Sequence, residues 1–477
     1  MNNHGASTGL AESGLEALTR RVERDLELLD YPRRPWLTPR HATSGEPVYD
    51  VAIVGGGQSG LTAAFGLMRE RVGNLLVLDE NPLDRAGPWL SFARMRTLRT
   101  PKYLTGPDLG IPSLTPRAWY EAQFGEGSWE ALGLLPKELW ANYLAWYRRT
   151  LRIPVESNTT VGALQYDDEA RQFLLPCSDA KGRRLLRARR VVLATGIDGS
   201  GEWRVPRSVS EALPPNLYAH TRDDIDFDAL RDKRIAVLGA GASAFDNAAT
   251  ALELGAREVH LFFRRPQLVN VNPYRWAEFV GFLKHHADLP DPEKWRFILQ
   301  ILRMGQLPPK DTLARAQEHA GFHLHAGSSW KSLVAHGDIV RLETESQRFD
   351  VDFVIVATGC VTDLAARPEL ANFEPQIARW ADRYTPPAEE AHEDLLRHPY
   401  LGKYFEFCQR HTGQAPYLAH LYNYTFGGLL SMGFGGASIS GLKYSAPRLV
   451  AGITRSLFLE DSGAHFESLC HFAEREF

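Results

Sequence analysis

The chain has 477 residues, which is enough for two or three domains with full hydrophobic cores. Its composition, with 44% apolar and 23% charged residues, is ordinary for a soluble globular protein. The formal net charge of −4 at pH 7 gives no reason to expect nucleic acid or an anionic membrane as a partner.

The sequence indicates neither membrane insertion nor secretion. No apolar run approaches the length of a membrane span, and the N-terminus lacks the charged-then-apolar layout of a signal peptide. The four cysteines are widely scattered, so we expect neither a disulfide framework nor a thiolate metal site. We therefore expect a cytoplasmic protein.

Residues 1–47 are predicted to be an N-terminal helical extension and a linker. Residues 1–12 are small and polar and are expected to be disordered. From Leu15 to Leu29, five apolar residues lie on one face of a helix, which predicts packing on the body or binding to a partner. Pro32, Pro35 and Pro39 then predict an extended linker.

A strand, a glycine turn and a helix follow one another at residues 51–70. Val51 to Val54 are apolar and mostly β-branched, which predicts a buried strand. The turn fits the G-x-G-x-x-G fingerprint of a dinucleotide-binding βαβ unit, in which a pyrophosphate binds at the helix N-terminus. The candidate cofactor contacts in this turn are Gly55, Gly57, Gln58, Ser59 and Gly60.

The next predicted strand, Leu75–Leu78, ends in two acidic residues, Asp79 and Glu80. An acid at this point of the unit binds a ribose hydroxyl, and Glu80 has the expected spacing from Gly55. A glycine-rich turn without a ligand is the alternative.

Between the two nucleotide fingerprints the sequence is less regular. Residues 85–124 are rich in proline and glycine, which predicts irregular loops. A helix is expected over Leu135–Arg149, and strands are expected around Val161 to Leu175. The buried strand Val191–Leu193 ends in Ala194, Thr195 and Gly196.

A second fingerprint begins with the predicted strand Arg234–Leu238. Its candidate cofactor contacts are Gly239, Gly241, Ser243 and Ala244, where alanine replaces the third glycine and is tolerated. The following strand, Glu258–Phe263, ends in Arg264 and Arg265 instead of an acid. An arginine there can pair with a 2′-phosphate, which favours NADPH over NADH, whereas a solvated charge is the alternative reading of Arg265.

A second Ala-Thr-Gly turn, which contains Thr358 and Gly359, follows the predicted strand Phe353–Val356. The second fingerprint thus lies between the two Ala-Thr-Gly turns. This order predicts an α/β fold of two Rossmann-like dinucleotide-binding domains, with the second domain inserted into the first. The predicted ranges are 48–228 for the first part of the outer domain, 229–334 for the inserted NADPH domain with a helical insert, and 335–477 for the second part of the outer domain and a C-terminal helix.

These motifs resemble the two-dinucleotide-domain flavoproteins, and within them the class B flavoprotein monooxygenases. The segment with Gly87 and Trp89 resembles the family's Gly-Gly-x-Trp segment around the flavin. Thr100-Pro101-Lys102 is similar to its Asn-Thr-Ser-Lys segment, and His220 is similar to its linker histidine. The linker departs from the family pattern at Pro214, Asn216 and Asp224, which marks an outlying member.

The resemblance implies FAD and NADPH as cofactors, with the NADPH domain inserted into the FAD domain. It also implies a C4a-(hydro)peroxyflavin that oxygenates a heteroatom, such as the nitrogen of an amine or amino acid. Baeyer–Villiger oxygenation of a ketone and a non-oxygenating FAD/NADPH oxidoreductase are the alternatives. A thioredoxin-reductase type is disfavoured because the sequence has no Cys-x-x-Cys pair. Molecular oxygen and a small-molecule substrate are the expected partners, and a homo-oligomer is left open.

Three residues are candidates for the catalytic site. Lys102 could orient the oxygenating group or pair with a carboxylate. Asn272 lies in a segment that faintly resembles the substrate region of amino-acid N-hydroxylases, and His220 could contact the nicotinamide nucleotide. No metal is expected, because His323 and His325 share a strand face without a third ligand.

Overall fold

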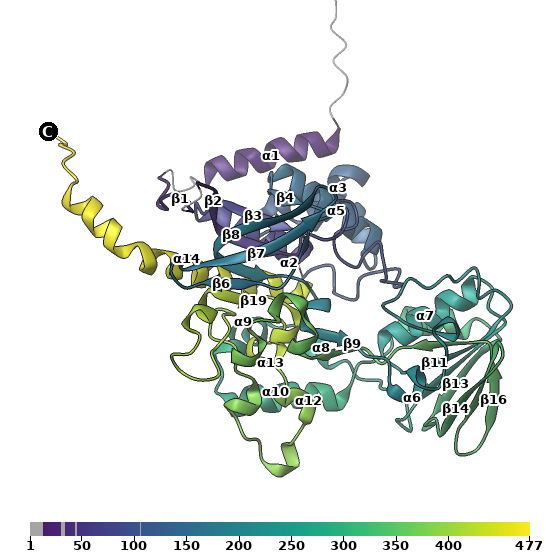
Figure 1. Cartoon of the computed structure of the whole chain (residues 1–477). Coiled ribbons are helices and arrows are strands. Elements are labelled where there is room, and N and C mark those ends of the chain that lie inside the picture. The colour runs from purple at the N-terminus through teal and green to yellow at the C-terminus, as the bar shows by residue number, and fades with distance from the viewer. Residues whose placement is uncertain (1–12, 30–33, 43–44, 105) are drawn as a thin grey trace, which may run out of the picture.

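The computed structural model describes residues 13–29, 34–42, 45–104 and 106–477 (Figure 1). The disorder predicted for residues 1–12 and the linker residue Pro32 lie outside these ranges. The predicted N-terminal helix is confirmed as α1 (Gly14–Leu28), which begins at a capping box between Ser13 and Glu16. It buries Leu18 and Val22 in the main core and therefore packs on the body.

The first sheet is nine-stranded and has β2 (Pro47–Val54) in its interior. β3 (Leu75–Leu78) and β8 (Gly182–Leu193) flank β2, and all three are parallel. β19 (Leu421–Asn423) also pairs with β8 in parallel. The remaining strands are β1 (Arg40–His41), β4 (Val155–Glu156), β5 (Thr160–Val161), β6 (Gln165–Asp167) and β7 (Gln172–Asp179).

The second sheet is five-stranded and wholly parallel, in the order β10-β17-β11-β12-β13. Helix α7 (Ala242–Glu253) packs on one face, and an antiparallel three-stranded sheet, β14-β15-β16, shares a core with the other. The strand bounds are β10 (Tyr218–His220), β11 (Arg234–Leu238), β12 (Glu258–Phe263), β13 (Phe322–Ala326), β14 (Ser332–His336), β15 (Ile339–Glu343), β16 (Arg348–Val351) and β17 (Phe353–Val356). A separate pair is formed by β9 (Gly201–Trp203) and β18 (Cys360–Thr362).

The insertion of the second nucleotide unit into the first is confirmed, because β19 rejoins the first sheet after the whole second sheet. Figure 1 shows the second unit, with α7, β11 and β13, standing apart from the first. Its strands extend beyond the predicted range 229–334 at both ends, to β10 and β17. The boundary at residue 334 is therefore wrong for the sheet, because β17 pairs with β11 instead of rejoining the first sheet.

Helices form where the sequence predicted them, and one also forms in a region that was predicted to be irregular. α2 (Gln58–Arg69) and α5 (Lys137–Thr150) match predictions, whereas the supposedly irregular region 85–124 contains α3 (Pro116–Phe124). This helix forms because the Thr115 side chain caps it and proline is favourable at the first helical position. The others are α4 (Ser128–Ala131), α6 (Arg207–Ser210), α8 (Pro273–Trp276), α9 (Val280–His285), α10 (Asp291–Met304), α11 (Lys310–Gln317), α12 (Glu393–Leu396), α13 (Leu429–Met432) and α14 (Ile439–Cys470).

Helices α8 to α10, predicted as an insert of the NADPH domain, share a core with the C-terminal part of the chain. Trp295 of α10 packs near Trp380, and Tyr274 of α8 stacks on Phe434. The helical insert therefore joins the second half of the FAD unit. No helix in the described parts of the chain is long and apolar enough to cross a membrane.

A buried charge cluster fastens the C-terminal helix to the first sheet. The Arg189 side chain on β8 is fully buried and donates to Asp50 at 3.0 Å and to Asp461 of α14 at 2.8 Å. Glu460 lies 3.3 Å from the same guanidinium. Burial alone would raise the pKa of Glu460, but Arg190 and Arg189 outweigh it and hold that pKa at about 2.

We expect Arg189→Met to lower the free energy of unfolding by about 3–5 kcal/mol, because buried carboxylates lose their partner. Urea titration monitored by circular dichroism measures this loss. Arg183→Met, at an exposed position on the same strand, is the control and should change it by less than about 0.5 kcal/mol. Equal losses in both variants would contradict the role of the cluster.

Candidate functional site

The first glycine turn leaves open space at one glycine only. Gly55 has a φ of +107°, and a Cβ there would lie 2.5 Å from the carbonyl oxygen of Ala194. A Cβ on Gly60 would overlap the carbonyl oxygen of Gly55, so this glycine permits the close packing of helix and strand. At Gly57, by contrast, the nearest atom would be the Cα of Gly87 at 3.9 Å. The space in front of Gly57 can therefore admit a ligand.

The acid beside this turn is Asp79. Its buried carboxylate accepts hydrogen bonds from the backbone N–H of Gly56 at 2.6 Å and of Asn81 at 2.8 Å. Glu80 is exposed and takes no part in these contacts. Of the two predicted acids, only Asp79 turns toward the glycine turn, and the ribose contact stays a prediction.

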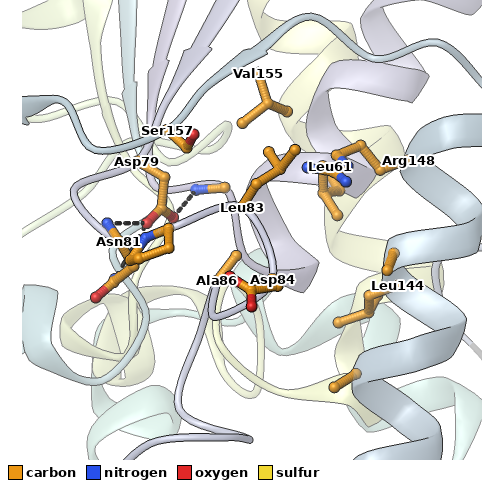
Figure 2. Close-up of a pocket in the computed structure, with 14 residues that line it drawn as sticks. Leu61, Asp79, Asn81, Leu83, Asp84, Ala86, Leu144, Arg148, Val155 and Ser157 are labelled. Carbon is orange, nitrogen blue, oxygen red and sulfur yellow. Dashed lines mark hydrogen bonds between the residues drawn. The ribbon is translucent and has the colours of Figure 1, made fainter.

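A pocket opens beside the turn at the carboxyl ends of β2 and β3 (Figure 2). It encloses about 470 Å³, part of which is open to solvent, and α5 forms one of its walls. Burial and the neighbouring Arg149 lower the pKa of Arg148, which points into the pocket from α5. Other lining residues include Leu61, Asp79, Asn81, Leu83, Leu144 and Ser157. Ligands of open α/β sheets bind in such crevices at the carboxyl ends of the strands.

The start of α2 is tied to the glycine-rich C-terminal segment. Gln58 accepts a hydrogen bond from Trp140 Nε1 at 3.1 Å and donates to the carbonyl oxygen of Ala437 at 3.1 Å. The Ser59 hydroxyl donates to the carbonyl oxygen of Gly436. Trp89 packs edge-on against Trp140, so the Gly87–Trp89 segment reaches this same region.

Three buried polar atoms around the first fingerprint have no hydrogen-bond partner among the described residues. They are Trp89 Nε1, Thr195 Oγ1 and Asn423 Nδ2. Thr195 follows β8, and Asn423 ends the adjacent β19, so both lie at the carboxyl edge of the first sheet. Gly196, next to Thr195, has a φ of +67° and accepts a hydrogen bond from Phe426 N. Unpaired buried donors are rare, and a bound polar molecule satisfies them.

The second glycine turn repeats this geometry. Gly239 has a φ of +128°, and a Cβ there would overlap the carbonyl oxygen of Ala357. A Cβ on Gly241 would meet only Gln306 Oε1, at 3.7 Å, so open space again lies at the second glycine. Ala244 is fully buried against the sheet, and Ser243 is exposed in the first turn of α7. Beyond Ala357, Thr358 donates to the carbonyl oxygen of Arg204, and Gly359 has a φ of +79°.

The two arginines after β12 have different surroundings. Arg265 donates to the carbonyl oxygens of Met304 and Arg303, at 3.0 and 3.2 Å, and so caps the end of α10. Arg264 is exposed and makes no hydrogen bond or ion pair with any described residue. Of the two arginines, Arg264 is therefore the one whose guanidinium remains available to bind a phosphate.

Comparisons with known proteins agree with this arrangement. The pyridine nucleotide-disulphide oxidoreductase family profile matches residues 49–285. The FAD-dependent urate hydroxylase of Xanthomonas campestris pv. campestris is 44% identical over 463 residues, covering 97% of each protein. The chain belongs to the class B flavoprotein monooxygenases. It is an FAD-dependent oxidoreductase of this family.

Solved structures of the family share the fold at low identity. The ornithine hydroxylase of Pseudomonas aeruginosa superposes with a TM-score of 0.68 at 14% identity, over 86% of this chain and 100% of that one. The ornithine N-hydroxylase of Kutzneria sp. 744 gives 0.66 at 16% identity, with the same coverage. The L-lysine 6-monooxygenase of Pseudomonas syringae gives 0.65 at 17%, over 86% of this chain and 99% of that one.

The family profile is named after disulphide reductases, but this monooxygenase has no paired cysteines. Cys177, Cys360, Cys408 and Cys470 are all free. No two of them are close enough in the sequence for a Cys-x-x-Cys motif.

Lys102 binds the end of a short helix. Its ammonium donates to the carbonyl oxygens of Trp129, Glu130 and Leu132, which uses its three N–H groups. These carbonyls lie at the end of α4, where a cation is stabilised by the helix dipole. Lys102 thus secures the end of α4, and its proposed catalytic role stays a prediction.

Asn272 is also a structural residue. Its side-chain oxygen caps α8 by accepting from the backbone N–H of Tyr274 and Arg275, at 3.1 and 3.3 Å. The residue is exposed, and Pro273 follows it as the first residue of the helix. The Asn-Pro pair therefore caps α8, and the catalytic role of Asn272 stays a prediction.

His220 lies buried at the end of β10, where the chain enters the second sheet. Its Nδ1 accepts from Arg222 N at 3.1 Å, while its Nε2 has no hydrogen-bond partner among the described residues. Burial lowers the pKa of His220, against the opposing effects of Asp223 and the Gly359 backbone. Burial therefore favours the neutral ring, and because Nδ1 accepts from Arg222 N, the proton of the neutral ring lies on Nε2.

Sequence reasoning missed the pocket wall formed by α5. Arg148 and Leu144 belong to a helix that the sequence predicted without assigning it to a site. A basic pair at the helix end, Arg148 and Arg149, was the one available signal, and it does not distinguish a pocket from solvent.

We expect Gly57→Val to yield a folded, colourless protein, because the added side chain enters the open space needed by the cofactor and meets little of the protein. Bound flavin is measured by absorbance and folding by circular dichroism. Gly60→Val is the matched comparison and should fail to fold, since its Cβ overlaps Gly55. A fully flavinated Gly57→Val variant would show that the first turn does not hold FAD.

We expect Arg264→Ala to raise the KM for NADPH roughly ten- to hundredfold, because the 2′-phosphate loses a hydrogen bond to a charged group. The KM for NADH should not change, because NADH has no 2′-phosphate. Steady-state kinetics with both nucleotides measure this preference. Arg265→Ala is the control and should lose NADPH preference much less, since its guanidinium caps α10. The reverse ranking would return the phosphate role to Arg265.

Proposed function

We propose that this monooxygenase hydroxylates urate, or an oxidised purine of similar shape, with NADPH and oxygen. The observation that carries the proposal is the 44% identity to an FAD-dependent urate hydroxylase over 97% of both chains. The amine hydroxylases share only the fold at 14–17% identity, so they support an amine substrate less. In the proposed reaction NADPH supplies two electrons, one oxygen atom enters the product, and the other leaves as water.

The residues around the first turn fit FAD. We assign the pyrophosphate to the open space at Gly57 and the N-terminus of α2, with Gln58 and Ser59 beside it. Asp79 would accept from a ribose hydroxyl, and the pocket beside α5 would hold the adenosine. Thr195 and Trp89 offer unpaired polar atoms toward the rest of the cofactor. FAD, when bound, supplies the chemistry of oxygen reduction and atom transfer.

The residues around the second turn fit NADPH. Gly241 leaves room for the pyrophosphate at the N-terminus of α7, and Arg264 would pair with the 2′-phosphate. His220, with a proton on a buried and unpaired Nε2, would donate to the nicotinamide half of the nucleotide. Its position next to the second Ala-Thr-Gly turn supports this role.

The protein's task in this chemistry is to exclude water and hold the cofactors in place. The Trp89–Trp140 contact and the Gln58 hydrogen bonds cover the start of α2 with buried aromatic rings. We further propose a cytoplasmic location, which suits four free thiols.

We expect urate to accelerate NADPH oxidation and to be consumed in a 1:1 ratio with NADPH and oxygen. Absorbance follows urate and NADPH, an oxygen electrode follows oxygen, and mass spectrometry after reaction under ¹⁸O₂ detects the labelled product. Ornithine, lysine and a cyclic ketone serve as comparison substrates. Coupled turnover of one of these without turnover of urate would overturn the urate assignment, and hydrogen peroxide release with every substrate would overturn oxygenation.

A further inference from the structure

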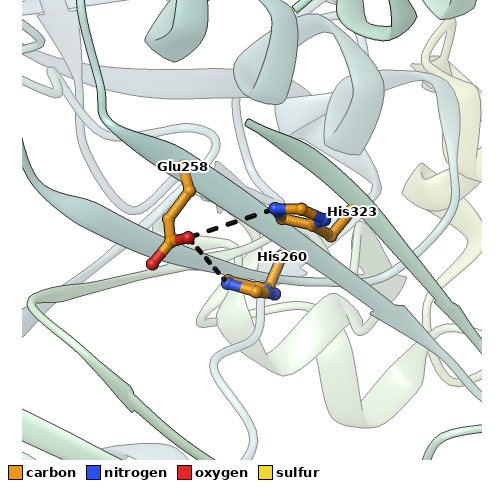
Figure 3. A group of neighbouring side chains, drawn as sticks. All are labelled: Glu258, His260 and His323. Atoms are coloured by element: carbon orange, nitrogen blue, oxygen red, sulfur yellow. Dashed lines mark ion pairs between the residues drawn. The ribbon is translucent and has the colours of Figure 1, made fainter. Parts of the chain in front are cut away.

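Three ligand-type side chains converge on one face of the second sheet (Figure 3). Glu258 and His260 lie on β12, and His323 lies on the neighbouring edge strand β13. One ligand atom from each lies within 4.8 Å of the others. The sequence pattern pointed only to His323 and His325, whereas Glu258 and His260 join His323 through the pairing of the strands.

The strand register explains why these side chains meet. Residues two apart on a strand share a face, which places Glu258 and His260 together. His260 is the direct parallel partner of His323 across the β12–β13 pair. The alternate residues Val259 and Leu261 point to the opposite face and are buried against α7. The group is thus held by two adjacent strands of a regular sheet.

The spacing of the group suits a cation better than direct hydrogen bonds. The Nε2 atoms of His260 and His323 lie 3.8 and 4.0 Å from the same carboxylate oxygen of Glu258. These distances exceed the limit for a hydrogen bond. A tetrahedral ion with bonds of about 2.0–2.1 Å holds its ligands roughly 3.3 Å apart, so small rotations of two partly exposed side chains suffice.

A fourth residue orients one of the imidazoles. His260 Nδ1 and His325 Nε2 are 2.9 Å apart. The His325 ring stacks on both the His260 ring and the Phe262 ring. A metal-bound histidine commonly donates its other ring N–H to a neighbouring acceptor, which fixes its tautomer. With His260 Nδ1–H donating to His325, the His260 Nε2 lone pair faces Glu258 and His323.

The site is open to solvent and separate from the nucleotide. The exposed fractions of the side chains are 43% for His323, 33% for Glu258 and 14% for His260. The nearby cation Arg234 is already paired with Asp352 at 2.8 Å. Glu258 is the first residue of β12, and Arg264 follows its last residue. The group therefore lies toward the amino end of β12, and the proposed 2′-phosphate contact lies at the carboxyl end.

We propose that Glu258, His260 and His323 bind one divalent transition-metal ion, with Zn²⁺ the best match to two imidazoles and a carboxylate. The ion would link β12 to the edge strand β13, and water would complete its coordination. Its role is to stabilise the edge of the nucleotide-binding sheet. This proposal is independent of the substrate.

The test is a Zn²⁺ titration of the metal-stripped, full-length flavoprotein in competition with a chromophoric zinc indicator. We expect one Zn²⁺ per chain and a higher midpoint of thermal unfolding with the ion bound. Glu258→Gln and His323→Ala should abolish both effects. His325→Ala should weaken binding roughly 10- to 100-fold, the usual effect of removing a residue that orients a ligand.

His336→Ala is the matched control, because it removes an exposed histidine of the same unit from outside the group. It should bind Zn²⁺ as the unaltered protein does. Flavin absorbance and circular dichroism verify that each variant is folded. Absence of stoichiometric Zn²⁺ binding, or equal binding by His323→Ala and the unaltered protein, would overturn the proposal.

Discussion

Each nucleotide unit depends on one close backbone contact between a glycine and an alanine carbonyl. Gly55 lies against Ala194, and Gly239 lies against Ala357, in both cases too closely for a Cβ. Both glycines have positive φ values, which an L side chain rarely adopts. The contact requires the fingerprint strand and the Ala-Thr-Gly strand to be parallel neighbours, as β2 and β8 are and as β11 and β17 are. It also places the open second glycine at the carboxyl edge of each sheet.

The inserted topology makes the connecting segments part of the site. Arg94 donates to the carbonyl oxygens of Thr221 and Asp223, which ties the loop after Trp89 to the linker that carries His220. In the same loop, Arg99 pairs with the buried Asp246 of α7. Residues near the proposed flavin site therefore contact the second unit directly. Such contacts fix the position of the second unit relative to the proposed flavin site.

The two ends of the second sheet serve different purposes. Its carboxyl edge carries the glycine turn and Arg264, where backbone N–H groups and a positive charge favour phosphate. Its opposite end carries Glu258, His260 and His323, whose chemistry favours a cation. The strand length separates the two regions. A metal bound by Glu258, His260 and His323 would stabilise the second unit without taking part in the reaction.

The sequence by itself determined the strands, the glycine turns and the insertion of one nucleotide unit into the other. These features follow from local patterns: apolar periodicity sets the strands, and glycine sets the turns that only it can adopt.

Tertiary structure decided which side chains meet. Lys102 caps α4, Asn272 caps α8 and Arg265 caps α10, so three predicted functional residues are occupied by helix ends. Asp79, rather than Glu80, turns toward the glycine turn, and β17 joins the second sheet. His260 and His323 meet only through the register of β12 and β13. Such partners come from segments far apart in the chain, and local sequence patterns cannot predict which distant segments will pair.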